Sequence, residues 1–179
     1  MIKNQQTMRV FFALWPEEPV RQALHALALA YQAPCGGRAM DAENLHLTLL
    51  FLGNLNRTCL PQLMACAGKV AVPAFEFALE RVALWRHIAC MLPEIEVPAL
   101  HRLHGALQDA LEAAGIACES REFSPHVTLL RHVEQALVPQ RIKPVRWRAN
   151  AFVLVESVTT DQGVRYRILQ QWSLGSQAG

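Results

Sequence analysis

The sequence predicts an α+β fold built as two lobes, and two observations carry this prediction. Predicted elements follow in the order strand–helix–strand–helix–strands and then helix–strand–strands along the 179 residues. Two strand-like segments, residues 46–50 and 126–130, also read almost alike, and a helical segment precedes each of them. The order therefore indicates a duplicated plan, with one of these segments in each lobe.

The first half of the chain predicts two strands and two helices. An apolar run over residues 9–15 indicates a buried strand. Residues 16–19 suit the first turn of a helix, because Pro and acidic side chains are favoured there, and apolar residues continue at helical spacing to Tyr31. Residues 34–37 end this helix, and a strand over residues 45–52 and a helix over residues 59–70 follow.

The second half predicts five strands and one helix. Residues 75–84 and 88–92 form two strands joined by a turn, and a leucine stripe with a following Gly115 indicates a helix over residues 99–114. The second motif strand then begins at His126, and strands over residues 147–156 and 164–171 complete the chain. Residues 1–7 are polar and expected to fray, and no linker separates the lobes, so we expect one domain over residues 1–179.

Composition limits the class of protein. The chain is 52% hydrophobic and 18% charged, which is enough for a packed interior, and its net charge of +2 excludes a strongly basic nucleic-acid coat while permitting a local basic groove. The five cysteines are scattered, without the spacing of a metal site, which favours reduced thiols and a cytoplasmic location. No apolar stretch reaches the length of a membrane span, so we expect a soluble protein.

The repeated segments carry the functional prediction. Side chains alternate between the faces of a strand, so His46 and Thr48 share one face, and His126 and Thr128 do the same. Facing each other across a groove, the two segments would place two imidazoles and two hydroxyls around one small anion, which is suited to acid/base chemistry at a phosphate. The alternative is that both segments are ordinary core strands.

The remaining histidines and several arginines have simpler interpretations. His101 and His104 lie one helical turn apart, but two histidines without an acidic or thiol partner make a poor metal site, so we expect no metal. Basic residues at positions 81, 86, 146 and 148 could line an RNA path, although such charges are more often solvated.

With both motifs placed, the chain resembles the 2H phosphoesterase superfamily and, within it, the RNA 2′,3′-cyclic phosphodiesterases, historically called 2′-5′ RNA ligases. The resemblance rests on residues 9–14, on residues 44–49 with 51–53, and on residues 123–131. It implies a bilobal arrangement of antiparallel sheets flanked by helices, with the active-site groove between the lobes.

The resemblance also implies a reaction and the roles of residues in it. A terminal 2′,3′-cyclic phosphate would be hydrolysed to a 2′-phosphomonoester, with His46 as proton donor, His126 as proton acceptor, and Thr48 and Thr128 binding the phosphate. The substrates would be RNA 3′ ends or nucleotides bearing such a phosphate. No cofactor, metal or membrane would be needed, and we expect a monomer.

One residue lies five positions after each motif histidine, namely Phe51 after His46 and Arg131 after His126. These two correspond to family positions that can sandwich the terminal base. Strict alternation would place both on the face opposite the histidines, so this assignment needs a twist or bulge in each strand. Otherwise Phe51 belongs to the core and Arg131 is a solvated charge.

Three rival functions stay open. The first is a 2H phosphoesterase acting on another small cyclic phosphate, with the same four motif residues. The second is a catalytically silent nucleotide-binding relative. The third is reversible ligation that forms 2′-5′ bonds.

Overall fold

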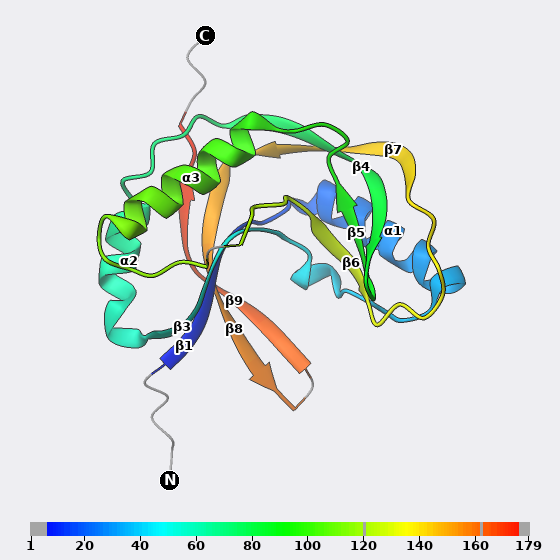
Figure 1. The fold of residues 1–179 in the computed structure, drawn as a ribbon, viewed down its shortest axis with the longest axis horizontal. Helices are drawn as coiled ribbons and strands as arrows, with labels where there is room; N and C mark the ends of the chain where they lie inside the picture. Colours follow the sequence, from blue (N-terminus) through cyan, green and yellow to red (C-terminus); the bar gives the residue numbers. More distant parts are fainter. Residues whose placement is uncertain (1–6, 120, 162, 176–179) are drawn as a thin grey trace.

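The computed structural model describes residues 7–119, 121–161 and 163–175 of the chain (Figure 1). Its strands are β1 (Thr7–Leu14), β2 (Arg38–Ala39), β3 (Leu47–Asn56), β4 (Phe75–Trp85), β5 (Ile88–Leu92), β6 (Val127–Arg131), β7 (Gln140–Ala149), β8 (Ala151–Thr160) and β9 (Gly163–Ser173). Its α-helices are α1 (Glu18–Cys35), α2 (Leu60–Ala67) and α3 (Pro98–Glu112), and the 3-10 helices η1 (Ala42–Asn44) and η2 (Arg57–Cys59) lie in the connections.

The strands form one sheet in the order β7-β4-β5-β6-β3-β1-β8-β9, with β2 paired to the outer part of β6. All pairs between these strands are antiparallel. The sheet consists of a first lobe (β3, β1, β8 and β9) and a second lobe (β6, β5, β4, β7 and β2), which are joined between β3 and β6 by the single register pair Leu47–Val127. The predicted α+β fold with two antiparallel lobes is therefore confirmed, and the motif strands are the innermost strands of their lobes.

The helices cross between the lobes. Helix α1 follows a first-lobe strand but packs against β6 and β7, whereas α3 follows a second-lobe strand but packs against β3 and α2. This exchange is visible in Figure 1, where α1 lies behind the second lobe and α3 covers the first. Each helix thus covers the lobe opposite to that of the motif strand it precedes, which the predicted order of elements did not indicate.

The register of the sheet explains the exchange. β1 ends at Leu14 opposite the start of β3 at Leu47, and Met91 near the end of β5 lies opposite the start of β6 at Val127. Both helical connections therefore leave and re-enter the sheet at the junction of the lobes. From that point each helix can reach the neighbouring lobe as directly as its own, and each packs on the neighbouring one.

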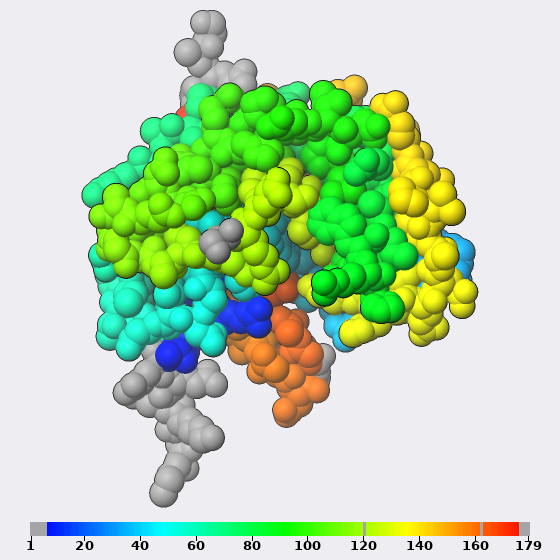
Figure 2. Space-filling model, in the orientation of Figure 1, coloured from blue at the N-terminus to red at the C-terminus, as the bar shows by residue number. Residues whose placement is uncertain are grey.

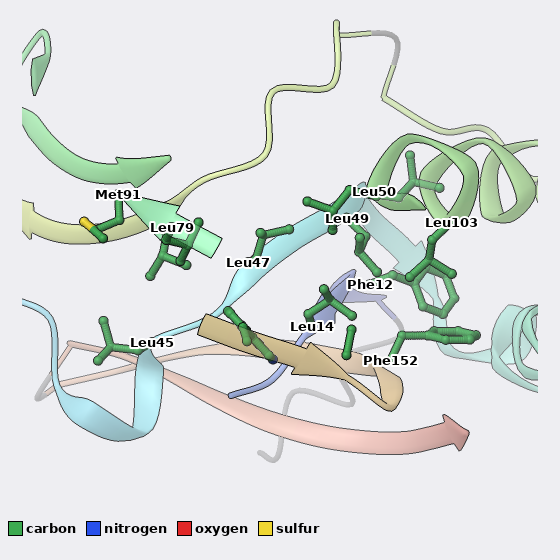
Figure 3. Packing of buried hydrophobic residues seen from close by; sticks show 14 of the residues in the cluster. Phe12, Leu14, Leu45, Leu47, Leu49, Leu50, Leu79, Met91, Leu103 and Phe152 are labelled. Atoms are coloured by element: carbon green, nitrogen blue, oxygen red, sulfur yellow. The ribbon is translucent and has the colours of Figure 1, made fainter. Parts of the chain in front are cut away.

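One hydrophobic core runs through the junction. Buried residues from both lobes form a single cluster, which extends from Leu79 and Met91 through Leu47 to Phe12 and Leu103 (Figure 3). Within the described parts of the chain, no helix is both long enough and apolar enough to span a bilayer.

Other differences from the predicted elements have local causes. β7 was not predicted before residue 147, because most of its residues are exposed and its core-facing apolar residues do not alternate regularly before Val145. It is an edge strand, where Pro144 is tolerated because its missing N–H would face solvent. The strand predicted over residues 147–156 is in fact the end of β7 and most of β8, which are separated at Asn150. Thr7, which was expected to fray, begins β1, whereas residues 1–6 lie outside the described residues.

Candidate active site

A cavity of about 650 Å³ lies between the lobes and is lined by both motif segments. The surface is hollowed where the segment leading into β6, the β4–β5 hairpin and the β8–β9 hairpin meet (Figure 2). His46, Thr48, His126 and Thr128 all line the cavity, as do Phe51 and Arg131. The structure therefore brings together all six of the site residues that the sequence predicts.

The two motif histidines are held in the same way. Each lies immediately before its strand, and its ring Nδ1 is hydrogen-bonded to the backbone carbonyl two residues earlier, at 2.7 Å for His46 to Asn44 O and 2.8 Å for His126 to Ser124 O. A carbonyl oxygen can only accept, so both rings carry a proton on Nδ1. This fixes the neutral tautomer with Nε2 free to exchange protons.

The surroundings of the two Nε2 atoms differ. Nε2 of His46 lies 3.1 Å from the Thr48 hydroxyl oxygen. Nε2 of His126 has no hydrogen-bond partner among the described residues. The His126 nitrogen is therefore the one available to a water molecule in the cavity.

Aromatic rings surround His46 much more completely than His126. Trp15 stacks flat on the His46 ring, with centroids 5.3 Å apart and an angle of 5°. Phe11 and Tyr166 contact the same ring, each with centroids 5.0 Å away. Among the aromatic rings of the described residues, His126 contacts only Trp85, at 4.7 Å and 62°, and Trp85 is itself exposed.

These environments set the charge of the pair. Burial lowers the pKa of His46 from 6.5 to about 4. The hydrogen bond to Asn44 raises this pKa, whereas the charge of a protonated His126 and the charge of Arg131 lower it. Burial also lowers the pKa of His126, again against its backbone hydrogen bond, and Arg131 acts in the same direction as burial. Both rings are therefore neutral at pH 7 in the free protein.

A bulge in each motif strand brings Phe51 and Arg131 to the cavity. In the β1–β3 pair, Thr48 lies opposite Ala13 and Phe51 opposite Phe11, so β3 contains one extra residue, Leu49. Because alternate residues of β1 share a face, the residues opposite them in β3 share one too.

The same device recurs in β6. Thr128 lies opposite Cys90 and Arg131 opposite Ile88, so Leu129 is the extra residue there. The predicted pairing of Phe51 and Arg131 around a base required such a bulge in each strand. The bulged leucines and the leucines after them are all buried, which a strictly alternating strand with one polar face would not allow.

Four arginines make this cavity basic. Arg9, Arg38 and Arg121 line it together with Arg131, and Glu119 and Glu122 are the acidic residues beside them. Arg9, Arg38 and Arg121 were not predicted from the sequence as site residues. The basic residues considered for an RNA path, at positions 81, 86, 146 and 148, are not among those that line the cavity.

His101 and His104 belong to an aromatic contact at the wall of the cavity. His104 stacks on Phe123 with centroids 4.4 Å apart and an angle of 8°, and His101 meets the same ring edge-on at 5.2 Å. In the described residues, no group of three or more His, Cys, Asp or Glu side chains is placed to hold a metal ion.

Comparison with known proteins identifies the family. A family model described as LigT-like phosphoesterase matches residues 14–89. A protein of Escherichia coli K12 named RNA 2′,3′-cyclic phosphodiesterase is 30% identical, and the alignment covers 94% of this chain and 98% of that protein. The chain belongs to the LigT-like phosphoesterase family.

Other relatives agree with this assignment. A Thermus thermophilus protein of the same name is 28% identical, with 96% of this chain and 93% of that protein covered. The crystal structure of apo E. coli LigT superposes with a TM-score of 0.85 at 27% identity, covering 96% of this chain and all of LigT. LigT complexed with 3′-AMP gives a TM-score of 0.83 at 28% identity, covering 94% of this chain and 98% of LigT.

Proposed function

We propose that this phosphoesterase hydrolyses 2′,3′-cyclic phosphates at RNA 3′ ends and leaves a 2′-phosphomonoester. The observation that carries the proposal is the pair of imidazoles in one cavity, each with Nδ1–H tied to a backbone carbonyl and Nε2 free to exchange a proton. The names of the relatives support the substrate, and a crystal structure of LigT holds 3′-AMP.

The reaction needs one proton more than the free site holds at pH 7. A phosphate anion between the two imidazoles raises the pKa of both, because an opposite charge stabilises their protonated forms. His46 takes this proton on Nε2, where the Thr48 hydroxyl oxygen can accept a hydrogen bond from it. Because the free Nε2 of His126 is the nitrogen available to water, and because the phosphate anion offsets the cost of burying a charged His46, we assign His46 as the proton donor.

His126 is the proton acceptor. Its free Nε2 removes a proton from a water molecule, whose oxygen forms a bond to phosphorus as the bond from phosphorus to O3′ breaks. His46 gives its proton to the departing O3′. The products are a 3′-hydroxyl and a 2′-phosphate, and the pair returns to its starting state by exchanging protons with water.

Thr48 and Thr128 bind the non-bridging phosphate oxygens, and Phe51 and Arg131 bind the terminal base. The hydroxyls donate hydrogen bonds to oxygens on which negative charge increases in the transition state. An aromatic ring and a guanidinium plane are stacking surfaces that accept any base. In the free protein the guanidinium of Arg9 lies over the Phe51 ring, 5.2 Å from its centroid, and Phe11 stacks on the same ring with centroids 5.4 Å apart, so a base that stacks on Phe51 takes the place of the Arg9 guanidinium.

The same groups account for 2′-5′ ligation. If a 5′-hydroxyl replaces the water, the same loss of O3′ leaves phosphorus bonded to O2′ and to the incoming O5′. Water is far more abundant than RNA ends, so hydrolysis dominates. We further propose that the enzyme acts without a metal, as a monomer in the cytoplasm, where its five unpaired cysteines would stay reduced.

Product analysis tests the proposal. An RNA that ends in a 2′,3′-cyclic phosphate is incubated with the enzyme, and phosphorus NMR is expected to show a 2′-phosphomonoester. His46→Ala and His126→Ala should each lower kcat by about a thousandfold. His25→Ala, on α1 and not among the residues that line the cavity, is the matched control. A 3′-phosphate product, or wild-type turnover in both histidine variants, would contradict the mechanism.

A further inference from the structure

Two arginines face each other across adjacent strands at the cavity. Arg38 in β2 is the register partner of Arg131 in β6, and both residues are exposed and line the cavity. Like charges directly opposite each other on antiparallel strands are destabilising. Among the described residues, no carboxylate forms an ion pair with either arginine.

The backbone holds this arrangement firmly. Gly37 has φ +78°, and a Cβ atom at this position would lie 2.6 Å from the Arg131 carbonyl oxygen. Only glycine therefore allows the backbone before β2 to approach β6 this closely. The Gln32 side chain donates a hydrogen bond to the Gly37 carbonyl at 3.1 Å, and Met40 N–H donates to Leu129 O at 2.8 Å. The fold therefore fixes the backbone positions from which both arginine side chains extend.

A second pair of arginines on adjacent strands has a carboxylate beside it. Arg81 in β4 is the register partner of Arg141 in β7, but Glu94 lies beside this pair, with a carboxylate oxygen 3.9 Å from Arg141 Nε. Among the described residues, no carboxylate forms such an ion pair with Arg38 or Arg131. Their combined positive charge therefore favours an anion that enters the cavity from solution.

The position of the pair indicates which anion this is. Arg131 is close enough to both motif histidines for its charge to act on them. Arg38 lies one strand further out, and its guanidinium nitrogens approach the turn between β8 and β9, where a Cβ at Gly163 would be 3.7 Å from Nη2. Arg38 therefore extends along the cavity, beyond the phosphate that reacts.

We propose that Arg38 binds the phosphodiester on the 5′ side of the terminal nucleotide, so that the site selects an oligoribonucleotide by its second negative charge. This inference rests on the proposed function and adds the class of substrate. A guanidinium suits the purpose because it pairs with phosphate oxygens through two parallel hydrogen bonds.

Two dinucleotides that differ only in charge test this. Both end in a 2′,3′-cyclic phosphate, but one has an ordinary 3′-5′ phosphodiester between its nucleosides and the other an uncharged methylphosphonate. The ratio of their kcat/KM values is measured for wild type, Arg38→Gln and Arg38→Lys, with Arg81→Gln as the control from the second arginine pair. Wild type and the control should prefer the charged dinucleotide by about tenfold, and Arg38→Gln should lose this preference.

Salt dependence gives a second readout. The dependence of log KM on log salt for the charged dinucleotide should weaken in Arg38→Gln and stay at the wild-type value in Arg38→Lys, which keeps the charge, because salt screens the attraction between the side chain and the phosphodiester. Equal wild-type turnover of both dinucleotides, or an unchanged preference in Arg38→Gln, would overturn the role of Arg38 while the proposed function stands. Absence of wild-type turnover on both would overturn the proposed function and this inference together.

Discussion

Replacing His46 by Gln is expected to make the protein less sensitive to acid. In the unfolded chain the imidazole binds a proton near its ordinary pKa of 6.5, whereas in the folded protein burial delays this until about pH 4. Between these values the unfolded state binds more protons than the native state, so the free energy of unfolding falls as the pH falls. The difference of 2.5 pH units, at about 1.4 kcal/mol each, corresponds to about 3 kcal/mol.

Urea unfolding of wild type and His46→Gln at about pH 7 and about pH 4 measures this effect. Carboxylates also titrate in this range, so the informative quantity is the loss of stability in wild type minus the loss in the variant. We expect about 3 kcal/mol for this difference. His25→Gln, on a partly exposed face of α1, controls for the removal of an imidazole elsewhere. If wild type and His46→Gln agreed to within about 0.5 kcal/mol, the reasoning about His46 would be wrong.

Three further predictions follow from the site and from its supporting turn. The pH profile of kcat/KM reports the pKa values of the free enzyme, and that of kcat reports those of the enzyme–substrate complex. Because the bound phosphate raises the lowered pKa values of His46 and His126, the basic limb of the kcat profile should lie at higher pH than the basic limb of the kcat/KM profile. Basic limbs at the same pH would contradict this. Thr128→Val should lower kcat by about a hundredfold and Thr128→Ser by far less, as measured by steady-state turnover. Gly37→Ala should lower the free energy of unfolding by more than the roughly 1–2 kcal/mol expected for Gly115→Ala. Both glycines have positive φ, but only a Cβ at Gly37 would also meet a close backbone atom. Urea unfolding of the two variants measures the difference.

The sequence was sufficient to predict the strands and helices that carry apolar patterns. The leucine stripe of α3 and the apolar run of β1 appear in the structure within one or two residues of their predicted ends. The first part of β7 was not predicted because most of its residues are exposed and its inward-facing residues Ile142 and Val145 do not alternate. The crossing of the helices also escaped, since it depends on which end of each strand meets the junction.

The motif residues were predictable because each lies within a repeated local pattern. His46 and Thr48 are two residues apart, and so are His126 and Thr128. Arg38 carries no such signal, because it reaches the cavity only through the pairing of β2 with β6. The rings around His46 illustrate the same limit, since Trp15 and Tyr166 are distant in the sequence and meet through β1 and the β8–β9 hairpin. Contacts between strands cannot be read from the local sequence.

The exchange of helices between the lobes also has a consequence for how the chain folds. Each half of the sheet is covered by a helix that belongs to the other half, and the central strands β3 and β6 join the halves through the pair Leu47–Val127. A fragment containing one lobe would therefore expose an apolar face that its own helix does not cover. We expect the chain to fold in one cooperative step and slowly, because the contacts that complete either half join segments distant in the sequence. The two imidazoles then reach their working separation only when the last helix docks.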